Sequence, residues 1–473
     1  MNFKSIFRNV AVLCAALGLA APAQAAAPTT VKHPEWAKNA VIYEVNTRQF
    51  TPEGTFKAMG AHLDRLKDLG VDILWFMPIH PISEKNRKGK LGSYYAVKDY
   101  TAVNPEFGTL DDFKSLVGEA HKRGMKVLLD WVPNHTGCDN AWVTEHPEYY
   151  ALDNNGKMFG PFDWTDTYKL DYSKPATRAA MISSMLFWLI EADIDGFRCD
   201  VASEVPVDFW NEARPVLQAA KPELFMLAEA SVPALEEHAF DMAYNWPMKD
   251  LFSAIAATSG QYTFVAPGAT EPRKFQRAVA TDIATLHQQQ QTDYPAGAYM
   301  MNMITNHDLN SWEGTEFERL GSLTPAFAVL SFTLPGMPLL YTGQEVGLNR
   351  AFEFFEKDKA PDWKANDFTE FYKMLTALKH SRPELNIGEG LQNMIVYSTV
   401  NPDLLVFERR AGKSATLVIV NLGKKSAKML FNGAEPDFKE FRKNPLASSK
   451  YSNNAVVVPY EITPGEYFVY TTD

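Results

Sequence analysis

The chain has few cysteines for its length and no excess of positive charge. Only 3 of its 473 residues are cysteine, and one of them, Cys14, lies in an apolar N-terminal segment. The other two, Cys138 and Cys199, are too few for a disulfide framework, and a chain this long can bury a core without disulfides. The formal net charge of −11 argues against nucleic acid or an anionic membrane surface as a partner.

Long apolar runs are also missing beyond the N-terminus, so the sequence predicts no insertion into a membrane. The N-terminus combines Lys4 and Arg8, the run VAVLCAALGLAA, and the small-residue pattern APAQA ending at Ala25. These three parts are typical of a secretory signal peptide. We therefore expect residues 1–25 to be removed and the protein to be exported, either to a periplasm or out of the cell.

Short β-rich runs alternate with amphipathic helical stretches from Ala40 onward. The expected strands are AVIYEVN, VDILWFMP, MKVLLDWVP, IDGFRCD, LFMLAEA, FDMAYNW, YMMNMITNHD and MPLLYTGQE. Near-continuous apolar strands separated by helices indicate a parallel sheet that is covered on both faces. Eight such units predict an α/β fold, a (β/α)8 TIM barrel over residues 34–384. A doubly wound open sheet is the alternative, but no glycine-rich phosphate loop follows the first strand.

Two further segments are expected outside the regular barrel. The stretch between the third strand and the next helix is longer than an ordinary loop, so residues 136–172 predict an inserted subdomain at the catalytic face. Its aromatic residues Trp142, Phe162 and Trp164 either line outer substrate sites or pack the core of the subdomain. From residue 385 to 473 the pattern predicts a C-terminal antiparallel β-sandwich, with strands MIVYSTV, LLVFERR, ATLVIVNL, AVVVPYEI and GEYFVYTT.

Polar side chains follow the predicted barrel strands at the point where each strand ends. In GFRCD, Arg198 and Asp200 lie two residues apart and point to one face, while Cys199 turns to the other. Barrel active sites form at the carboxyl ends of the strands. The other residues in such positions are Asp130, Asn134, His135, Glu229, Asn306, His307 and Asp308.

Carboxylates, histidines and an arginine at one barrel mouth fit the hydrolysis of glycosidic bonds. A retaining glycosidase uses one carboxylate as nucleophile and a protonated carboxyl group as acid, about 5 Å apart. An arginine beside the nucleophile favours its charged form, whereas the acid needs a raised pKa. We therefore expect Arg198 to hold Asp200 as a carboxylate. A purely structural buried ion pair is the alternative.

The spaced motifs DWVPNH, GFRCD, LAEA and TNHD resemble the four conserved regions of the α-amylase family of glycoside hydrolases, family 13. SYYAVKDYTAVNPEFGT and LPGMPLLYTGQE are similar to further segments of that family, and the likeness extends from Val41 to about Arg382. The segment DVASEVPVDFW resembles neopullulanases and cyclomaltodextrinases more than typical α-amylases. The barrel follows the signal closely, so we expect no N-terminal β domain of the neopullulanase kind, and a monomer rather than their dimer.

The resemblance implies catalytic roles for three carboxyl groups. Asp200 is implied as the nucleophile and Glu229 as the general acid/base. Asp308 is implied to bind and distort the sugar in the cleaved position. A glutamate at the end of an apolar strand is costly without a role, which favours function over packing for Glu229.

Further residues are implied to bind the sugar or support the site. His135, His307 and Arg198 would contact the sugar or orient the carboxylates, although the histidines could instead be core residues with satisfied hydrogen bonds. Tyr95 would stack on the sugar, with its neighbour Tyr94 as the alternative. Asp130 and Asn134 are expected to have structural roles near the site. Glu204 is expected either to approach the acceptor side of the substrate or to face solvent.

The calcium site of typical α-amylases is expected to be absent. Lys169 stands where many of them have a calcium-binding aspartate, and Val205 replaces a histidine whose carbonyl completes the site. Asn134 alone cannot supply the six or more oxygens that calcium needs. CDN and ALDNNG could form a non-standard calcium site, but such runs are more typical of turns. The sequence therefore predicts no required cofactor or metal.

Together these features predict a retaining hydrolase that cleaves α-1,4-glucosidic bonds in starch-type glucans or maltooligosaccharides through a covalent glucosyl-enzyme. An α-glucosidase, a cyclomaltodextrinase or a transglycosylase on the same scaffold is the first alternative. A carbohydrate-binding protein without catalysis is the second, and the presence of all three carboxyl groups disfavours it.

Overall fold

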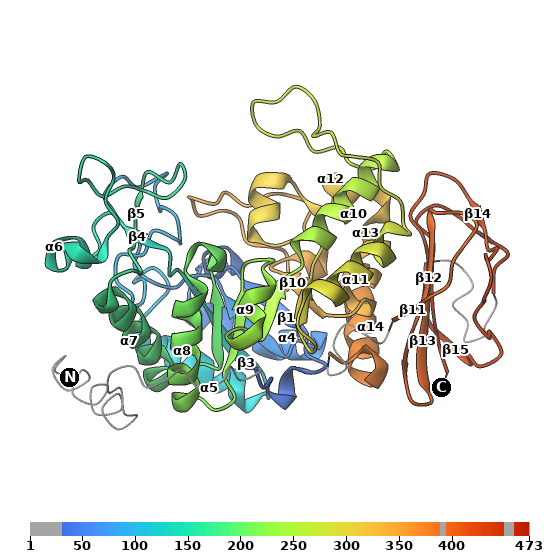
Figure 1. The fold of residues 1–473 in the computed structure, drawn as a ribbon, viewed down its shortest axis with the longest axis horizontal. Helices are drawn as coiled ribbons and strands as arrows, with labels where there is room; N and C mark the ends of the chain where they lie inside the picture. Colours follow the sequence, from blue (N-terminus) through green and yellow to red (C-terminus); the bar gives the residue numbers. More distant parts are fainter. Residues whose placement is uncertain (1–30, 388–393, 449–457, 473) are drawn as a thin grey trace.

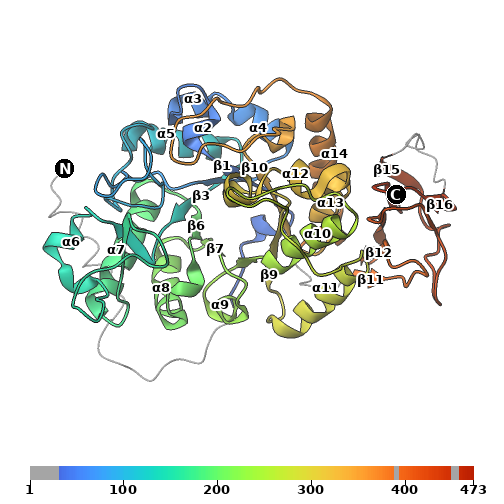
Figure 2. The same cartoon turned by 90° about the horizontal axis from the view of Figure 1, so that it is seen from above.

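The structure is a computed structural model that describes residues 31–387, 394–448 and 458–472. The predicted signal peptide lies outside these residues. Along the longest axis, the barrel lies in the middle, the inserted subdomain at one end and the C-terminal sheets at the other (Figure 1). The view from above shows the same order (Figure 2). No helix in the described parts of the chain is long and apolar enough to cross a membrane.

Eight parallel strands close into a barrel, which confirms the predicted fold. Each strand pairs with its neighbours in the order β1-β10-β9-β8-β7-β6-β3-β2, and β2 pairs with β1 to close the ring. The strands are β1 (Ile42–Val45), β2 (Ile73–Phe76), β3 (Lys126–Trp131), β6 (Gly196–Cys199), β7 (Phe225–Ala228), β8 (Met242–Tyr244), β9 (Tyr299–Asn302) and β10 (Met337–Tyr341).

Helices surround the barrel, as Figure 2 shows. Three of the longer helices, α5, α10 and α14, start at a capping side chain: Thr109, for example, forms a capping box with Asp112 at the start of α5. The longer helices are α5 (Leu110–Lys122), α7 (Pro175–Glu191), α8 (Val207–Ala220), α10 (Trp246–Thr258), α11 (Asp282–Asp293), α13 (Thr324–Thr333) and α14 (Asp367–Ser381).

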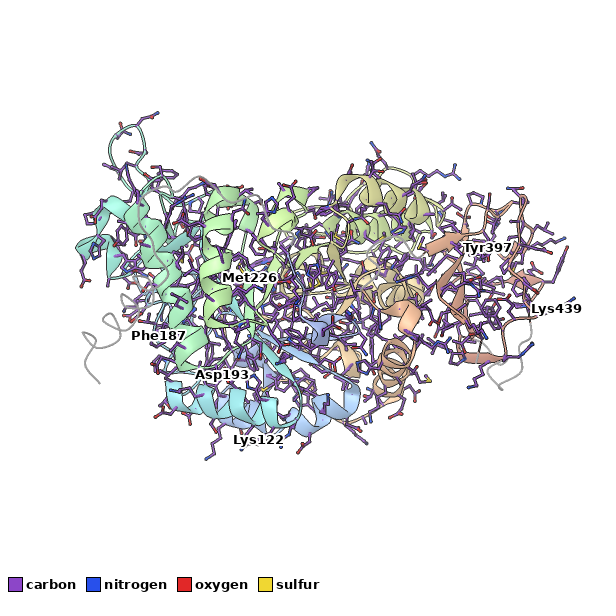
Figure 3. The ribbon with its side chains drawn as sticks, turned by 60° about the horizontal axis from the view of Figure 1, so that its bottom comes forward. Lys122, Phe187, Asp193, Met226, Tyr397 and Lys439 are labelled. Atoms are coloured by element: carbon purple, nitrogen blue, oxygen red, sulfur yellow. The ribbon has the colours of Figure 1, made fainter. Side chains whose placement is uncertain are left out.

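Residues alternate between the barrel interior and the helix layer along each strand. On β7, Phe225 and Leu227 belong to the inner cluster, whereas Met226, labelled in Figure 3, packs with the outer cluster. The inner cluster is apolar along most of the strands. Towards their carboxyl ends the buried charged side chains of Glu44, Asp130 and Arg198 take its place. This polar layer is the floor of the candidate site.

The inserted subdomain is built on a short antiparallel pair, β4 (His135–Gly137) and β5 (Thr167–Lys169). Trp142 opens the short helix α6 (Trp142–Glu145) and packs against Tyr100 and Tyr149, with ring centroids 5.1 and 5.4 Å away. Trp142 is therefore a packing residue of the subdomain. Phe162 is 65% exposed, and Trp164 lies between Phe162 and His135.

The C-terminal part forms a five-stranded antiparallel sheet in the order β11-β12-β13-β17-β15 and a separate pair, β14 with β16. One face of the large sheet packs on the barrel through residues such as Phe407 and Val418, and the other face packs on the pair. Figure 3 labels Tyr397 and Lys439 in this region. The strands are β11 (Met394–Val396), β12 (Leu404–Ala411), β13 (Ser414–Asn421), β14 (Ala427–Lys428), β15 (Lys443–Ala447), β16 (Glu461–Ile462) and β17 (Tyr467–Thr471).

Two details of this region differ from the predicted strands. The described part of the run AVVVPYEI is a strand only at Glu461–Ile462, and neither β14 nor β15 was predicted. β15 is an edge strand containing Pro445, and a proline favours a turn when the sequence is considered alone. Pairing with β17 overrides that preference.

Candidate active site

Arg198 lies fully buried on β6 and contacts three carboxyl groups at the carboxyl end of the barrel. Its Nη1 lies 2.8 Å from Asp130 Oδ1 and 3.1 Å from Asp200 Oδ1, and its Nη2 lies 3.0 Å from Glu229 Oε2. These groups meet because β3, β6 and β7 are neighbours, with Asp130 directly beside Arg198 in the register. One guanidinium therefore joins the predicted nucleophile and the predicted acid.

The charge balance at Asp200 differs from the expectation that Arg198 alone keeps it ionised. Burial and then the carboxyl group of Glu229 raise the pKa of Asp200 well above its usual value, and Arg198 lowers it by less. Burial and the neighbouring carboxyl group thus disfavour the charged form of Asp200, and Arg198 favours it. A nucleophilic role requires that charged form.

The turn after Asp200 has a strained backbone. Val201 has φ 35° and ψ 49°, a left-handed conformation that β-branched residues rarely adopt. Its N–H donates a hydrogen bond of 2.8 Å to Glu229 Oε2, the same oxygen that contacts Arg198. Strain of this kind costs on the order of 1–3 kcal/mol and persists only where the surroundings impose it. The turn thereby fixes Glu229 relative to Asp200.

His307 follows β9 and is held between groups from distant parts of the chain. Its Nδ1 lies 2.5 Å from Glu44 Oε1 on β1, and its Nε2 lies 2.7 Å from the hydroxyl of Tyr95 and 3.4 Å from Asp308 Oδ2. Burial lowers the pKa of His307, but Asp308 and Glu44 together outweigh it and raise the pKa to about 9. The ring is therefore an imidazolium at neutral pH.

Tyr95, not Tyr94, faces the site. The Tyr95 hydroxyl lies 3.1 Å from Asp130 Oδ2, and its ring stacks on His307 with centroids 5.5 Å apart. The Tyr94 hydroxyl instead donates to Asn46 Oδ1, and its ring lies under the guanidinium of Arg48.

His135 lies on β4, where the inserted subdomain begins. Burial lowers its pKa to about 3, so the ring is neutral at any working pH. The Asn134 amide nitrogen lies 3.5 Å from its Nδ1, and Trp164 meets the ring edge to face with centroids 5.1 Å apart. Asn134 also accepts a backbone hydrogen bond from Leu170 and so ties the subdomain to the end of β3.

Comparison with known proteins decides the family. The family "Alpha amylase, catalytic domain" matches residues 33–169 and 148–382 in two overlapping segments. The chain belongs to the α-amylase family. It is 27% identical over 407 residues to the α-amylase MalA of Haloarcula japonica, covering 82% of this chain and 56% of that protein. It is 26% identical over 446 residues to a cyclomaltodextrinase of a Bacillus species, covering 82% and 73%.

A solved structure agrees with this assignment. An α-amylase from Lactobacillus plantarum superposes with a TM-score of 0.76 at 30% identity, covering 92% of this chain and 99% of that one. The chain is thus an amylase-family glycoside hydrolase related to cyclomaltodextrinases and maltogenic amylases. It spans little more than half the length of the Haloarcula relative.

The residues at the expected calcium position of the family do not fit a calcium ion. The Lys169 ammonium lies 3.6 Å from Glu204 Oε2, and both side chains are about one-third exposed. A positive side chain cannot ligate a cation. Glu204 therefore pairs with the subdomain across the edge of the site, close to the turn that carries Asp200.

The acidic side chains of the two segments considered for a non-standard calcium site accept backbone hydrogen bonds. Asp139 accepts backbone bonds from Glu84 and Lys85, and Asp153 accepts them from Asn155 and Lys157. Within the described residues, no group of three or more His, Cys, Asp or Glu side chains is arranged to hold a metal ion.

Several residues of the amylase-family site were missed in the sequence. Glu44 is one, although an acidic residue within the apolar strand AVIYEVN is the same signal that pointed to Glu229. Trp75 and Tyr244 are aromatic strand residues that hydrogen-bond Asp130 and Arg198, at 3.1 Å each. The Phe354 ring stacks nearly parallel to Tyr95 and lies beside the half-exposed Trp312. Neither residue belongs to a predicted strand, so the strand pattern could not identify them.

Proposed function

We propose that the protein is an exported, retaining hydrolase of α-1,4-glucosidic bonds in starch-type glucans or maltooligosaccharides. The observation that carries this proposal is the placement of Asp200 and Glu229 on the two terminal nitrogens of Arg198. In the proposed reaction, Glu229 protonates the leaving oxygen while Asp200 attacks the anomeric carbon. Glu229 then takes a proton from water, which releases the sugar from Asp200.

The surroundings of the carboxyl groups support a sugar ring as the ligand. Tyr95 offers an aromatic face at the floor of the site, and His307 and Asp308 offer a charged donor and acceptor beside it. Trp164 lies on the subdomain side, next to His135, and Trp312 follows Asp308 and β9, which lies across the barrel from β3. Aromatic faces and paired polar groups are the usual partners of the two faces and the hydroxyl edges of a sugar.

The proposal includes a monomeric enzyme that needs no calcium. The ion pair of Lys169 with Glu204 supports the second point, because it occupies the place where the family resemblance would put the ion. Export is supported by the three-part N-terminal pattern of residues 1–25. Size-exclusion chromatography, chelator treatment of the active protein and sequencing of the mature N-terminus test these three points.

The function is tested by digesting maltoheptaose and recording both product lengths and the anomer of each new reducing end. A spread of shorter α-anomeric products is expected from a retaining endo-acting hydrolase. Glucose alone indicates an α-glucosidase, and products longer than the substrate indicate a transglycosylase. Products in the β form contradict the retaining mechanism.

The assignment of the nucleophile is tested with Asp200→Asn. This variant is expected to lose turnover by about 10⁴-fold or more, because an amide cannot form the covalent intermediate, while it still binds maltoheptaose. Asp193→Asn is the matched control, since Asp193 precedes β6 at the opposite end of the barrel and is exposed (Figure 3). Near-normal turnover of Asp200→Asn contradicts the assignment. Binding without turnover by the unmutated protein indicates a carbohydrate-binding protein instead.

A further inference from the structure

Glu44 is a buried carboxylate that the proposed reaction does not use. It lies on β1 with no exposed surface, and both of its oxygens face a single residue, His307. Oε1 lies 2.5 Å from the ring Nδ1, and Oε2 accepts the backbone N–H of His307 at 3.3 Å. One carboxylate thus fixes both the ring and the main chain of a residue 263 positions away.

The hydrogen atoms in this network can be counted. The Tyr95 hydroxyl has one hydrogen but two close neighbours, His307 Nε2 at 2.7 Å and Asp130 Oδ2 at 3.1 Å. If the ring is neutral, with its hydrogen on Nδ1 towards Glu44, that single hydroxyl hydrogen must serve both neighbours. If the ring is an imidazolium, Nε2–H donates to Tyr95 and Tyr95 donates to Asp130. Every contact then has its own hydrogen.

The charged and titratable groups around the ring come from five places in the fold. Glu44 on β1 and Asp308, next to His307 in the chain, favour the positive ring, and Arg198 on β6 opposes it. Asp130 on β3 interacts favourably with the ring as well, and the Tyr95 hydroxyl stays protonated because burial raises its pKa. The balance raises the pKa of His307 to about 9, despite complete burial.

The alternative explanation is that Glu44 has a purely structural role and only stabilises the barrel. Buried carboxyl groups elsewhere in the chain do serve the backbone: Glu236 on α9 (Pro233–His238) accepts the N–H of Tyr299 at 3.2 Å. Glu44 differs because its partners continue into the site. Through His307 and Tyr95 it is connected to Asp130, and Asp130 is bonded to Arg198.

We propose that Glu44 is a positioning residue that keeps His307 doubly protonated, so that the ring holds Tyr95 against Asp130 and places a positive charge beside Asp308. This inference rests on the proposed hydrolysis at Asp200 and Glu229. Its consequence is that Glu44, together with Asp308, sets the alkaline limit up to which the sugar-binding side of the site stays assembled.

The test is the pH dependence of kcat/KM on maltoheptaose for the unmutated protein and Glu44→Gln. Glutamine keeps the shape and can still accept from Nδ1, but it does not favour the positive ring. The loss caused by Glu44→Gln is expected to grow with pH, from about threefold at pH 5 to about 30-fold at pH 8.5, because the ring keeps Asp308 but loses Glu44, and its pKa falls from about 9 towards the ordinary histidine value near 6.5. A purely structural role predicts a constant factor at every pH, and that result overturns the proposal.

Two controls accompany this experiment. Glu236→Gln removes a buried carboxyl group outside the site and is expected to leave the shape of the pH profile unchanged. Glu44→Asp retains the charge and is expected to restore much of the activity of Glu44→Gln at pH 8.5. If Glu44→Asp is as impaired as Glu44→Gln and equally dependent on pH, the charge is not the cause.

Ring titration by nitrogen-15 NMR tests the proposal without any catalytic readout, and also covers the case in which Glu44→Gln does not fold. Both ring nitrogens of His307 are expected to be protonated at pH 7.5 in the unmutated protein, with His307→Gln used to assign the signals. A neutral His307 ring at pH 7.5 overturns the proposal. Failure to cleave glucans with a protonated ring counts against the proposed function alone.

Discussion

Two buried histidines on opposite sides of the site show how differently the fold treats the same side chain. His135 and His307 are each 1% exposed, and each follows an asparagine in the sequence. Burial lowers the pKa of His135 to about 3, whereas the pKa of His307 is raised to about 9. Depth in the protein alone therefore does not decide whether a buried histidine is charged.

The difference lies in what the neighbouring elements supply. On the subdomain side, His135 meets the uncharged Trp164 ring and Asn134 amide, and the positive charge of Lys169, its partner across β4 and β5, lowers its pKa further. On the other side, β1 supplies Glu44 and the chain itself supplies Asp308. A carboxylate in direct contact outweighs the cost of burying a positive ring, and a neutral neighbour does not.

The contrast between the two histidines is tested most strongly by replacing each ring in turn. His307→Gln is expected to lower kcat/KM on maltoheptaose at pH 7 by about 10²–10³-fold, since it removes a charged donor from the site. His135→Gln is expected to cost only about tenfold, since it removes a neutral hydrogen-bonding group. Steady-state kinetics on the two purified variants measure this difference. Equal losses contradict the assignment of a neutral ring to His135 and a positive ring to His307.

Stability against pH offers a second test of the same contrast. Below pH 6.5 the unfolded chain protonates His135, but the folded ring stays neutral down to about pH 3, so stability falls as the pH drops through this window. His307 has the opposite sign: its contribution is complete below pH 6.5 and is lost as the pH rises through about 9.

Urea unfolding at pH 4.5, 7 and 9 measures these windows. His135→Gln is expected to lose less stability than the unmutated protein between pH 7 and 4.5, by one to a few kcal/mol at about 1.4 kcal/mol per pKa unit. His307→Gln is expected to lose less between pH 7 and 9. The same slope in all three proteins contradicts the contrast.

The smallest effect is expected from the aromatic neighbours of His135. Trp164→Ala is expected to raise KM for maltoheptaose about three- to tenfold, because a stacking face of about 1 kcal/mol is lost, with an unchanged melting temperature. Trp142→Ala is the matched control: its ring packs between Tyr100 and Tyr149, so it is expected to destabilise the subdomain by about 2 kcal/mol with little change in KM. If both variants behave alike, Trp164 is another packing residue.

Much of the fold follows from local features of the sequence. Apolar strands such as VDILWFMP alternate with helices such as α5, and this pattern leads to a closed parallel barrel. Polar residues at the strand ends, including Asp200 and Glu229, converge because parallel strands point their carboxyl ends to one side. These properties depend on residues a few positions apart, which is why the sequence alone could predict them.

The charge states of the site residues, their hydrogen-bond partners and the direction in which each side chain points could not be predicted from the sequence. They depend on distances between residues that are far apart in the chain. Arg198 contacts Glu229 as well as Asp200, and Tyr95 rather than Tyr94 faces the site. Glu44 contacts His307, although the two residues are 263 positions apart in the chain. A pKa responds to the charges within a few ångströms and to the loss of water around the group. Neither can be computed from spacing along the chain, so the charge of each histidine was decided only by the tertiary structure.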